Sequence, residues 1–125
     1  MRTAILMAAY NGGKYLREQL DSILAQTYRD FLLYIRDDGS TDDTPQILAQ
    51  YAAQDSRIRM VADTVKHRGC SGSFRYLTET VDADCYLFSD QDDVWLPEKV
   101  ERTLDRLRAF GDSTPAAVHT DLQVV

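Results

Sequence analysis

Five short apolar runs are spaced along the chain, and each has the length of a β-strand. They cover Thr3–Ala9, Phe31–Ile35, Ile58–Ala62, Cys85–Ser89 and Ala116–Val125. A continuous apolar run is typical of a strand buried on both faces, as in a parallel sheet. The runs therefore predict five strands of a mostly parallel sheet.

Between these runs, apolar residues recur at intervals of three and four, the spacing of one face of a helix. The predicted faces are formed by Leu16, Leu20, Ile23 and Leu24, by Ile47, Leu48, Tyr51 and Ala52, by Phe74, Leu77 and Val81, and by Val100, Leu104 and Leu107. The last helix is expected to begin at Pro97 and to end at Gly111. The segment Thr64–Ser73 contains two glycines and is expected to be a loop.

Strands that alternate with helices indicate an α/β fold, here a doubly wound, mostly parallel, Rossmann-like sheet. The 125 residues are enough for one domain, and 44% of them are hydrophobic, which is enough for a core. A net charge of −6 argues against nucleic acid as a partner, because phosphate-backbone binding depends on many Lys and Arg contacts.

Cysteine content and hydropathy argue against a disulfide-rich, zinc-binding or membrane-spanning protein. Cys70 and Cys85 are too few for a disulfide framework or a zinc site. No apolar run approaches the roughly 18 to 20 residues that span a bilayer. We expect a cytoplasmic protein, with a peripheral place at the inner face of the plasma membrane as an alternative.

Polar residues follow the first, second and fourth predicted strands. They are Tyr10 and Asn11, then Asp37 and Asp38, then Asp90, Asp92 and Asp93. In open α/β sheets the ligand lies beyond the carboxyl ends of the strands, near the point where the strand order reverses. If these three strands are neighbours, the three polar groups meet at one edge of the sheet.

The acidic group after the fourth strand favours a metal–diphosphate site. Asp90 can accept hydrogen bonds from ribose hydroxyls, and Asp92 can bind Mg²⁺ or Mn²⁺ that bridges two phosphates. Taken alone, such a cluster is more often solvated charge at a helix N-terminus. Positive charge near the phosphates is expected from Arg75 or from residues 66–68.

The groups after the first two strands suit a nucleoside. Asp38 can accept the N3 hydrogen of uracil or thymine, which adenine lacks. The small Ala8 and Ala9 leave room for the base, and Tyr10 can lie against the ring. Taken alone, each of these polar stretches is more often a turn.

Four sequence blocks resemble family 2 glycosyltransferases with the A-type nucleotide-sugar fold. The blocks are Ala8-Ala9-Tyr10-Asn11-Gly12, Gln26-Thr27-Tyr28, Asp37-Asp38-Gly39-Ser40-Thr41-Asp42, and Ser89-Asp90-Gln91-Asp92-Asp93 with Trp95-Leu96-Pro97-Glu98-Lys99. The residues of the last block look most like those of the bacterial rhamnosyltransferase-like branch, which builds surface polysaccharides.

The resemblance implies roles for individual residues. Asp38 matches the aspartate that contacts the base, Asp90 the one near the ribose, and Asp92 the metal-binding aspartate. The remaining nucleotide-sugar-binding positions are Ala8, Ala9, Tyr10, Asn11, Gln91, Gly72 and Arg75. A nucleotide-diphosphate sugar is the implied donor, and a saccharide or lipid-linked saccharide is the implied acceptor.

One part of the family pattern lies outside the 125 residues. The family inverts configuration with an acidic general base in an acceptor-binding half, which is expected beyond Val125. We therefore expect a truncated, donor-binding part, residues 1–125, that binds nucleotide and metal with little turnover. Exposure of the uncovered face makes a homodimer conceivable.

Three other classes remain as alternatives. A receiver-like signalling module binds Mg²⁺ through an acidic pair, but it needs a lysine after the fifth strand, and Ala116–Val125 contains none. A nucleotidyltransferase normally opens with a glycine-rich basic loop, of which Tyr10–Lys14 is a thin version. A dinucleotide-dependent oxidoreductase is disfavoured, because no Gly-x-Gly-x-x-Gly motif follows the first predicted strand.

Overall fold

The structure, a computed structural model, describes residues 2–62, 69–89, 94–109 and 116–119. Its strands are β1 (Thr3–Ala9), β2 (Leu32–Asp37), β3 (Ile58–Met60), β4 (Cys85–Ser89) and β5 (Ala116–His119). Its helices are α1 (Gly13–Leu24), α2 (Thr44–Gln54), α3 (Gly69–Thr80) and α4 (Lys99–Ala109). The sheet has the order β3-β2-β1-β4-β5, and every adjacent pair is parallel. The predicted fold class is confirmed.

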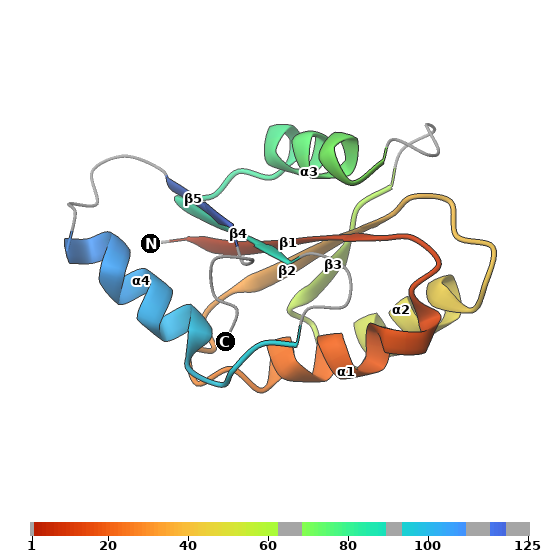
Figure 1. Ribbon diagram of the computed structural model, residues 1–125, viewed down its shortest axis with the longest axis horizontal. Helices are drawn as coiled ribbons and strands as arrows, with labels where there is room; N and C mark the ends of the chain where they lie inside the picture. Colours follow the sequence, from red (N-terminus) through yellow and green to blue (C-terminus); the bar gives the residue numbers. More distant parts are fainter. Residues whose placement is uncertain (1, 63–68, 90–93, 110–115, 120–125) are drawn as a thin grey trace.

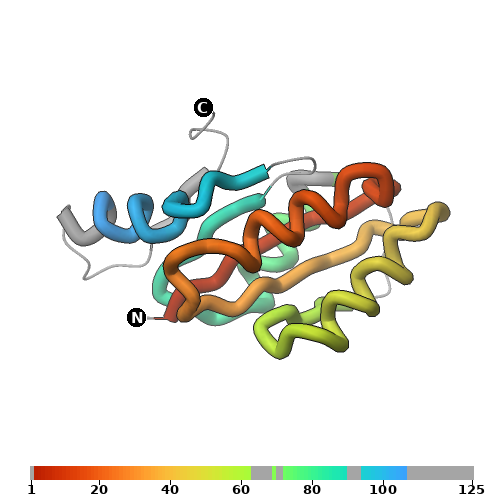
Figure 2. Tube along the Cα trace, turned by 90° about the horizontal axis from the view of Figure 1, so that it is seen from below, coloured from red at the N-terminus to blue at the C-terminus, as the bar shows by residue number. Residues whose placement is uncertain are grey.

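Helices cover both faces of the sheet. In Figure 1, α1, α2 and α4 lie below the sheet and α3 lies above it. The view from below shows α1 between α2 and α4 (Figure 2). Side chains of β1 alternate between the two faces of the sheet. Ile5 and Met7 belong to the core between the sheet and α1, and Ala4 and Leu6 belong to the core between the sheet and α3. Among the described residues, no helix is long and apolar enough to cross a membrane.

The bounds of β1 and β4 agree with the predicted strands, because both are continuous apolar runs. β2 differs, since it begins at Leu32 and continues through the charged residues Arg36 and Asp37. Arg36 is only 1% exposed, so the strand stays buried where the sequence turns polar. β3 is shorter than predicted, although the Val61 amide still donates to Ile35 O at 2.9 Å.

Two helix starts were predicted wrongly. α3 begins at Gly69, inside the segment expected to be a loop. Among its described side chains, Ser73 is buried, and hydrophobic spacing does not detect this polar residue. α4 begins at Lys99 instead of Pro97, after a turn in which the Lys99 amide donates to Leu96 O at 3.1 Å.

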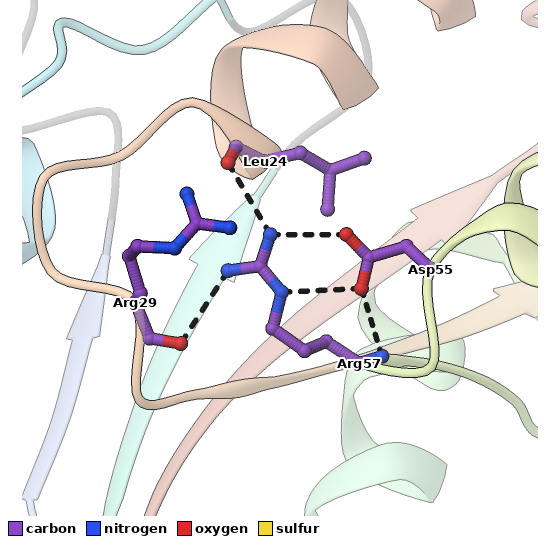
Figure 3. A network of polar contacts seen from close by, with 4 residues as sticks. All are labelled: Leu24, Arg29, Asp55 and Arg57. Atoms are coloured by element: carbon purple, nitrogen blue, oxygen red, sulfur yellow. Dashed lines mark hydrogen bonds and ion pairs between the residues drawn. The ribbon is translucent and has the colours of Figure 1, made fainter.

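A polar network centred on Arg57 joins segments at the amino ends of the strands, opposite the carboxyl ends of β1 and β2 (Figure 3). The Arg57 guanidinium donates to Asp55 through Nε and Nη2, at 3.1 and 3.0 Å. It also donates to the backbone oxygens of Leu24, at 3.3 Å, and Arg29, at 3.4 Å. Its carbon lies 4.7 Å from the centre of the Phe31 ring. One side chain thus joins the end of α1, the loop before β2 and the turn before β3.

Replacing Arg57 with alanine is expected to destabilise the fold by about 1–3 kcal/mol, because it removes charged hydrogen bonds from a part-buried network. Urea unfolding measures the change. The matched control is Arg59→Ala, which removes an exposed arginine and is expected to change stability by less than about 0.5 kcal/mol. Equal effects of the two substitutions would contradict the role of the network.

The same network predicts a pH dependence. Hydrogen bonds from Arg57 lower the pKa of Asp55 below its ordinary value of 3.8. Asp55 therefore binds a proton less tightly in the folded state than in the unfolded state. The stabilisation that its ionised form gives to the fold is complete above about pH 3.8 and is lost as the pH falls below that value. The stability difference between the unmodified protein and Asp55→Asn is expected to shrink as the pH falls through this range. Urea unfolding at a series of pH values tests this, and a difference independent of pH would refute it.

Candidate functional site

The carboxyl ends of β1, β2 and β4 lie next to one another, and we call the residues that follow them the carboxyl edge. Ala9 of β1 pairs with Asp37 of β2, and Met7 of β1 pairs with Ser89 of β4. The strand order reverses at β1, since β2 and β3 lie on one side of it and β4 on the other. Ligands of open α/β sheets bind beside such a reversal. The three strands are neighbours, which was the condition for their polar groups to meet at one edge.

Asn11 ties the turn after β1 to the loop after β2. Its φ of 48° is left-handed, a conformation that asparagine adopts more readily than most residues. Its Oδ1 accepts a hydrogen bond from the Thr41 amide at 2.7 Å, and its own amide donates to Ser40 Oγ at 2.8 Å. Ser40 Oγ in turn donates to Asp37. The polar groups of Asn11 therefore hold two loops together at the carboxyl edge.

The other candidates at the end of β1 are small or exposed. Ala9 is 4% exposed and packs in the core beneath α1, while Ala8 is half-buried. The Asp38 amide donates to Ala9 O at 2.8 Å, which fixes the start of the second loop beside β1. Tyr10 is 42% exposed. The structure thus brings Ala8, Ala9, Tyr10, Asn11 and Asp38 together.

Side chains from the start of α2 cap the N-terminus of α1. The Gly12 amide donates to Thr44 Oγ1 at 3.0 Å, and the Gly13 amide donates to Asp42 Oδ2 at 3.1 Å. Hydrogen bonds with Thr44 lower the pKa of Asp42, which is therefore ionised at neutral pH. A β-carbon on Gly13 would lie 2.0 Å from Asp43 Oδ1, so a larger residue there would displace that carboxylate. In dinucleotide-binding folds, phosphate occupies such helix amides, whereas here a carboxylate and a hydroxyl do.

Asp38 is held by a buried ion pair. It is 5% exposed, and its Oδ1 lies 2.5 Å from Nη1 of Arg36. Its Oδ2 accepts from the Gly69 amide at 2.9 Å. Nη1 of Arg36 also donates to Ser73 Oγ at 2.8 Å, and the guanidinium carbon lies 5.9 Å from the centre of the Tyr76 ring. The carboxylate is therefore fixed in orientation between β2 and α3.

Sequence reasoning missed the residues that hold Asp38. The only signal was Arg36, a charged residue at the end of an otherwise apolar run. A buried arginine requires a partner, and a carboxylate two residues along the same strand lies on the same face of the sheet. The pair was thus available from the sequence, whereas the contribution of α3 was not.

Gly72 and Arg75 lie on α3, apart from the candidates just described. Among the described residues, a surface hollow is lined by Gly72, Arg75, Tyr76 and Glu79. The Arg75 side chain is 82% exposed, and its Nε lies 3.5 Å from Glu79 one helical turn away. No described contact joins Gly72 or Arg75 to Asp38 or Asn11. A role for Gly72 and Arg75 near the donor therefore stays a prediction.

Asp90, Gln91 and Asp92 lie outside the described residues, but the chain on both sides of them is described. Before them, Ser89 is fully buried, and its Oγ accepts from Gln19 Nε2 at 2.9 Å. After them, the Trp95 amide donates to Ser22 Oγ at 3.0 Å. Both flanks of the acidic stretch are thus bonded to α1.

Gln26 extends this attachment. Its Nε2 donates to Leu96 O at 2.7 Å, and its Oε1 accepts from the Val100 amide at 2.9 Å. The next residue, Thr27, donates its amide to Pro97 O at 2.9 Å. Sequence reasoning matched Gln26 only through the family resemblance. The structure gives it a physical role, which is to hold the chain that follows the acidic stretch.

Trp95 is 5% exposed and packs in the same core cluster as residues of α1 and α4. Nζ of Lys99 lies 5.2 Å from the centre of its ring. Its indole N–H has no hydrogen-bond partner among the described residues.

Metal ligands and nucleophiles are not evident elsewhere. Within residues 2–62, 69–89, 94–109 and 116–119, no three His, Cys, Asp or Glu side chains form a group that could hold a metal ion. Asp92, the predicted ligand, falls outside these ranges. Burial raises the pKa of the Cys85 thiol to about 11, so this thiol stays protonated, as expected for a core residue.

Comparison with known proteins places this geometry in a family. The model for glycosyl transferase family 2 matches residues 4–120. The chain is 37% identical over 105 residues to dTDP-rhamnosyl transferase RfbG of Shigella flexneri, covering 81% of this chain and 36% of that protein. It is 32% identical over 102 residues to a putative glycosyltransferase, EpsE, of Bacillus subtilis, covering 81% of this chain and 36% of that protein. The chain thus spans about a third of the length of these relatives.

Solved structures share the fold. TarS of S. aureus, residues 1–349 in complex with UDP-GlcNAc, superposes with a TM-score of 0.77 at 23% identity, covering 87% of this chain and 32% of that chain. The mannosyltransferase PcManGT of Pyrobaculum calidifontis, in complex with GDP-Man and Mn²⁺, gives a TM-score of 0.77 at 22% identity, covering 85% and 32%. The family match over almost the whole sequence and the shared architecture agree, and the chain belongs to glycosyl transferase family 2.

Proposed function

We propose that this chain is the donor-binding part of a metal-dependent, inverting glycosyltransferase that uses a UDP- or dTDP-sugar. The observation that carries the proposal is the meeting of Tyr10, Asn11 and Asp38 at the carboxyl edge, beside the strand that leads into the acidic stretch. The name of RfbG favours dTDP-rhamnose as the donor and a role in bacterial surface polysaccharide synthesis.

Asp38 is suited to contact the base. Its two oxygens each accept one described hydrogen bond, from Arg36 and from Gly69. An ionised carboxylate only accepts, which favours the N3–H of uracil or thymine over the bare N3 of cytosine. Tyr10, directly after β1, supplies an exposed ring.

The diphosphate needs positive charge or free hydrogen-bond donors beside it. The amides at the start of α1 are bonded to Thr44 and to the ionised Asp42. A diphosphate at that helix would therefore meet a negative charge instead of free donors. We assign the cation to Asp92 and the ribose to Asp90, because carboxylate oxygens are the ligands that Mg²⁺ and Mn²⁺ prefer. When bound, the cation neutralises the charge of the leaving diphosphate.

Donor binding and catalysis fall on different parts of such a protein. Curated relatives are about three times as long as this chain, which covers 36% of RfbG. We place the general base and the acceptor site beyond residue 125, so the isolated chain is expected to bind donor and metal with little turnover. The acceptor is proposed to be a saccharide or a lipid-linked saccharide.

The rival classes fit the geometry less well. Nucleotidyltransferases and dinucleotide-dependent enzymes place phosphate on a glycine-rich loop or helix N-terminus. The corresponding amides of Gly12 and Gly13 are already bonded here.

Calorimetric titration tests the donor and the metal. With Mn²⁺ present, UDP or dTDP is expected to bind at least about tenfold more tightly than ADP, a difference of roughly 1.4 kcal/mol. Asp92→Asn is expected to remove the effect of Mn²⁺ on nucleotide affinity. The control Asp30→Asn makes the same charge change at an exposed position at the opposite end of the sheet, and should have no effect. Equal affinity for UDP, dTDP and ADP would refute the base assignment, and an unchanged Mn²⁺ effect would refute the metal assignment.

The role of Asp38 is tested by Asp38→Asn. The amide keeps an oxygen for Arg36, while its NH2 group replaces the oxygen that accepts from the Gly69 amide and offers a donor that suits N3 of cytosine. The preference for UDP over CDP is expected to fall about tenfold, since one hydrogen bond to a charged group contributes about 1.5–3 kcal/mol. Competition between UDP and CDP on the same protein sample measures this ratio independently of how much protein is folded. A ratio equal to that of the unmodified protein would contradict base contact by Asp38.

A further inference from the structure

Arg36 is among the largest fully buried side chains of the described residues, although it carries a charge. A buried guanidinium is unfavourable unless its charge is paired and its N–H groups are bonded. Its side chain and that of Asp38, two residues along the chain, lie on the face of the sheet that α3 covers (Figure 1). A well-packed apolar pair at these positions would often be as stable. The presence of an arginine must therefore be explained by the partners that it holds.

Helix α3 contacts both members of the Arg36–Asp38 pair. Nη1 of Arg36 lies 2.5 Å from Asp38 Oδ1 and also donates to Ser73 Oγ, at 2.8 Å. The ring of Tyr76, about one turn further along α3, has its centre 5.9 Å from the guanidinium carbon. Asp38 Oδ2 accepts from the amide of Gly69, the residue at which α3 begins, at 2.9 Å. The helix thus holds one oxygen of Asp38 directly and the other through Arg36.

We propose that Arg36, held in place by Ser73, is the positioning residue that gives the site its preference for a base with an N3 hydrogen. The inference rests on the proposed function, which assigns the base contact to Asp38. A carboxylate discriminates against cytosine only while it is ionised, because a protonated carboxyl has an O–H that can donate to the bare N3 of cytosine. A buried carboxylate without a cation beside it tends to take up a proton. Arg36 therefore keeps Asp38 a pure acceptor.

Ser73 contributes by fixing where the guanidinium lies. Arginine has a long side chain, and holding it in one conformation costs entropy. The Ser73 hydroxyl, which is on a residue only 1% exposed, accepts from the same nitrogen that bonds Asp38. Without this hydroxyl, Arg36 keeps its charge but is freer to turn, and the plane of the Asp38 carboxylate is less well defined. A serine on α3 thereby affects which base is preferred, although the base contact is assigned to the loop after β2.

A purely structural role for these contacts makes a different prediction. If they only stabilise the fold, their loss reduces the amount of folded protein, and the affinities for UDP and CDP fall alike. If they keep Asp38 an oriented acceptor, their loss weakens UDP binding more than CDP binding. The two nucleotides have the same ribose and diphosphate and differ only in the base. Their affinity ratio therefore reports on the base contact and is independent of where the metal and the phosphates bind.

The experiment measures competition between UDP and CDP for the unmodified chain, Arg36→Met and Ser73→Ala. Arg36→Met removes the charge while filling much of the same space, and the preference for UDP is expected to fall about tenfold. Ser73→Ala leaves the ion pair in place, and a fall of about threefold is expected, because only the anchor of Arg36 is lost. The matched control is Thr78→Ala on the same helix, whose hydroxyl donates to Arg75 O at 2.9 Å. This variant should leave the ratio unchanged.

Ser73→Ala also covers the case in which Arg36→Met does not fold, since it leaves no buried charge unpaired. A UDP-to-CDP ratio in Ser73→Ala equal to that of the unmodified protein, with or without an equal loss of both affinities, overturns the inference. Failure of the proposed function gives another result. If the unmodified protein binds UDP and CDP equally, or if Asp38→Asn leaves their ratio unchanged, the base contact of Asp38 is refuted and this inference with it. If Asp38→Asn lowers the ratio and Ser73→Ala does not, the base contact stands and this inference alone is refuted.

Discussion

Helix α1 has to bury polar side chains as well as apolar ones, and much of the site depends on how it does so. Its apolar residues Leu16, Leu20 and Ile23 pack against the sheet as in any α/β protein. Its N-terminus is bonded to the loop after β2, and its buried amides are bonded to the chain around β4. One helix therefore sets the distance between the two segments to which the base and the diphosphate are assigned. A shift of α1 along the sheet would break bonds at both ends, which keeps it in a single register.

The Arg36–Asp38 pair performs a similar function on the other face of the sheet. Burying two charges is costly, and a well-packed apolar pair is often as stable or more so. Stability alone therefore gives a weak reason for the pair. Its geometry gives a better one, because Arg36 and the Gly69 amide each occupy one oxygen of Asp38 and fix the plane of the carboxylate. A carboxylate with a fixed plane can distinguish hydrogen-bond donors from acceptors on a planar base.

Much of the fold could be predicted from the sequence, because the parallel strands are continuous apolar runs. The ends of β1 and β4 were predicted correctly, and the meeting of Tyr10, Asn11 and Asp38 followed from the topology rule. Two of the errors arise from the burial of polar residues. Arg36 extended β2 and Ser73 extended α3 past the points where the hydrophobic pattern ended. Hydrophobic spacing carries no information about such residues, since their burial is decided by partners distant in sequence.

The occupied N-terminus of α1 also separates this site from the dinucleotide-binding fold that its sheet resembles. In that fold, glycine amides and the helix dipole neutralise the pyrophosphate, so no cation is needed. Here Gly12 and Gly13 serve the protein's own Thr44 and Asp42, and the ionised Asp42 reverses the charge presented at that point. At Gly12 and Gly13 a diphosphate would meet this negative charge instead of free amides. A cation would both bind the diphosphate and stabilise the charge that develops on it as it leaves. A helix N-terminus beside β1 would stabilise that charge less directly. The internal capping of α1 thus occupies two amides of the usual phosphate site, and the proposed cation at the acidic stretch after β4 would supply the positive charge in its place.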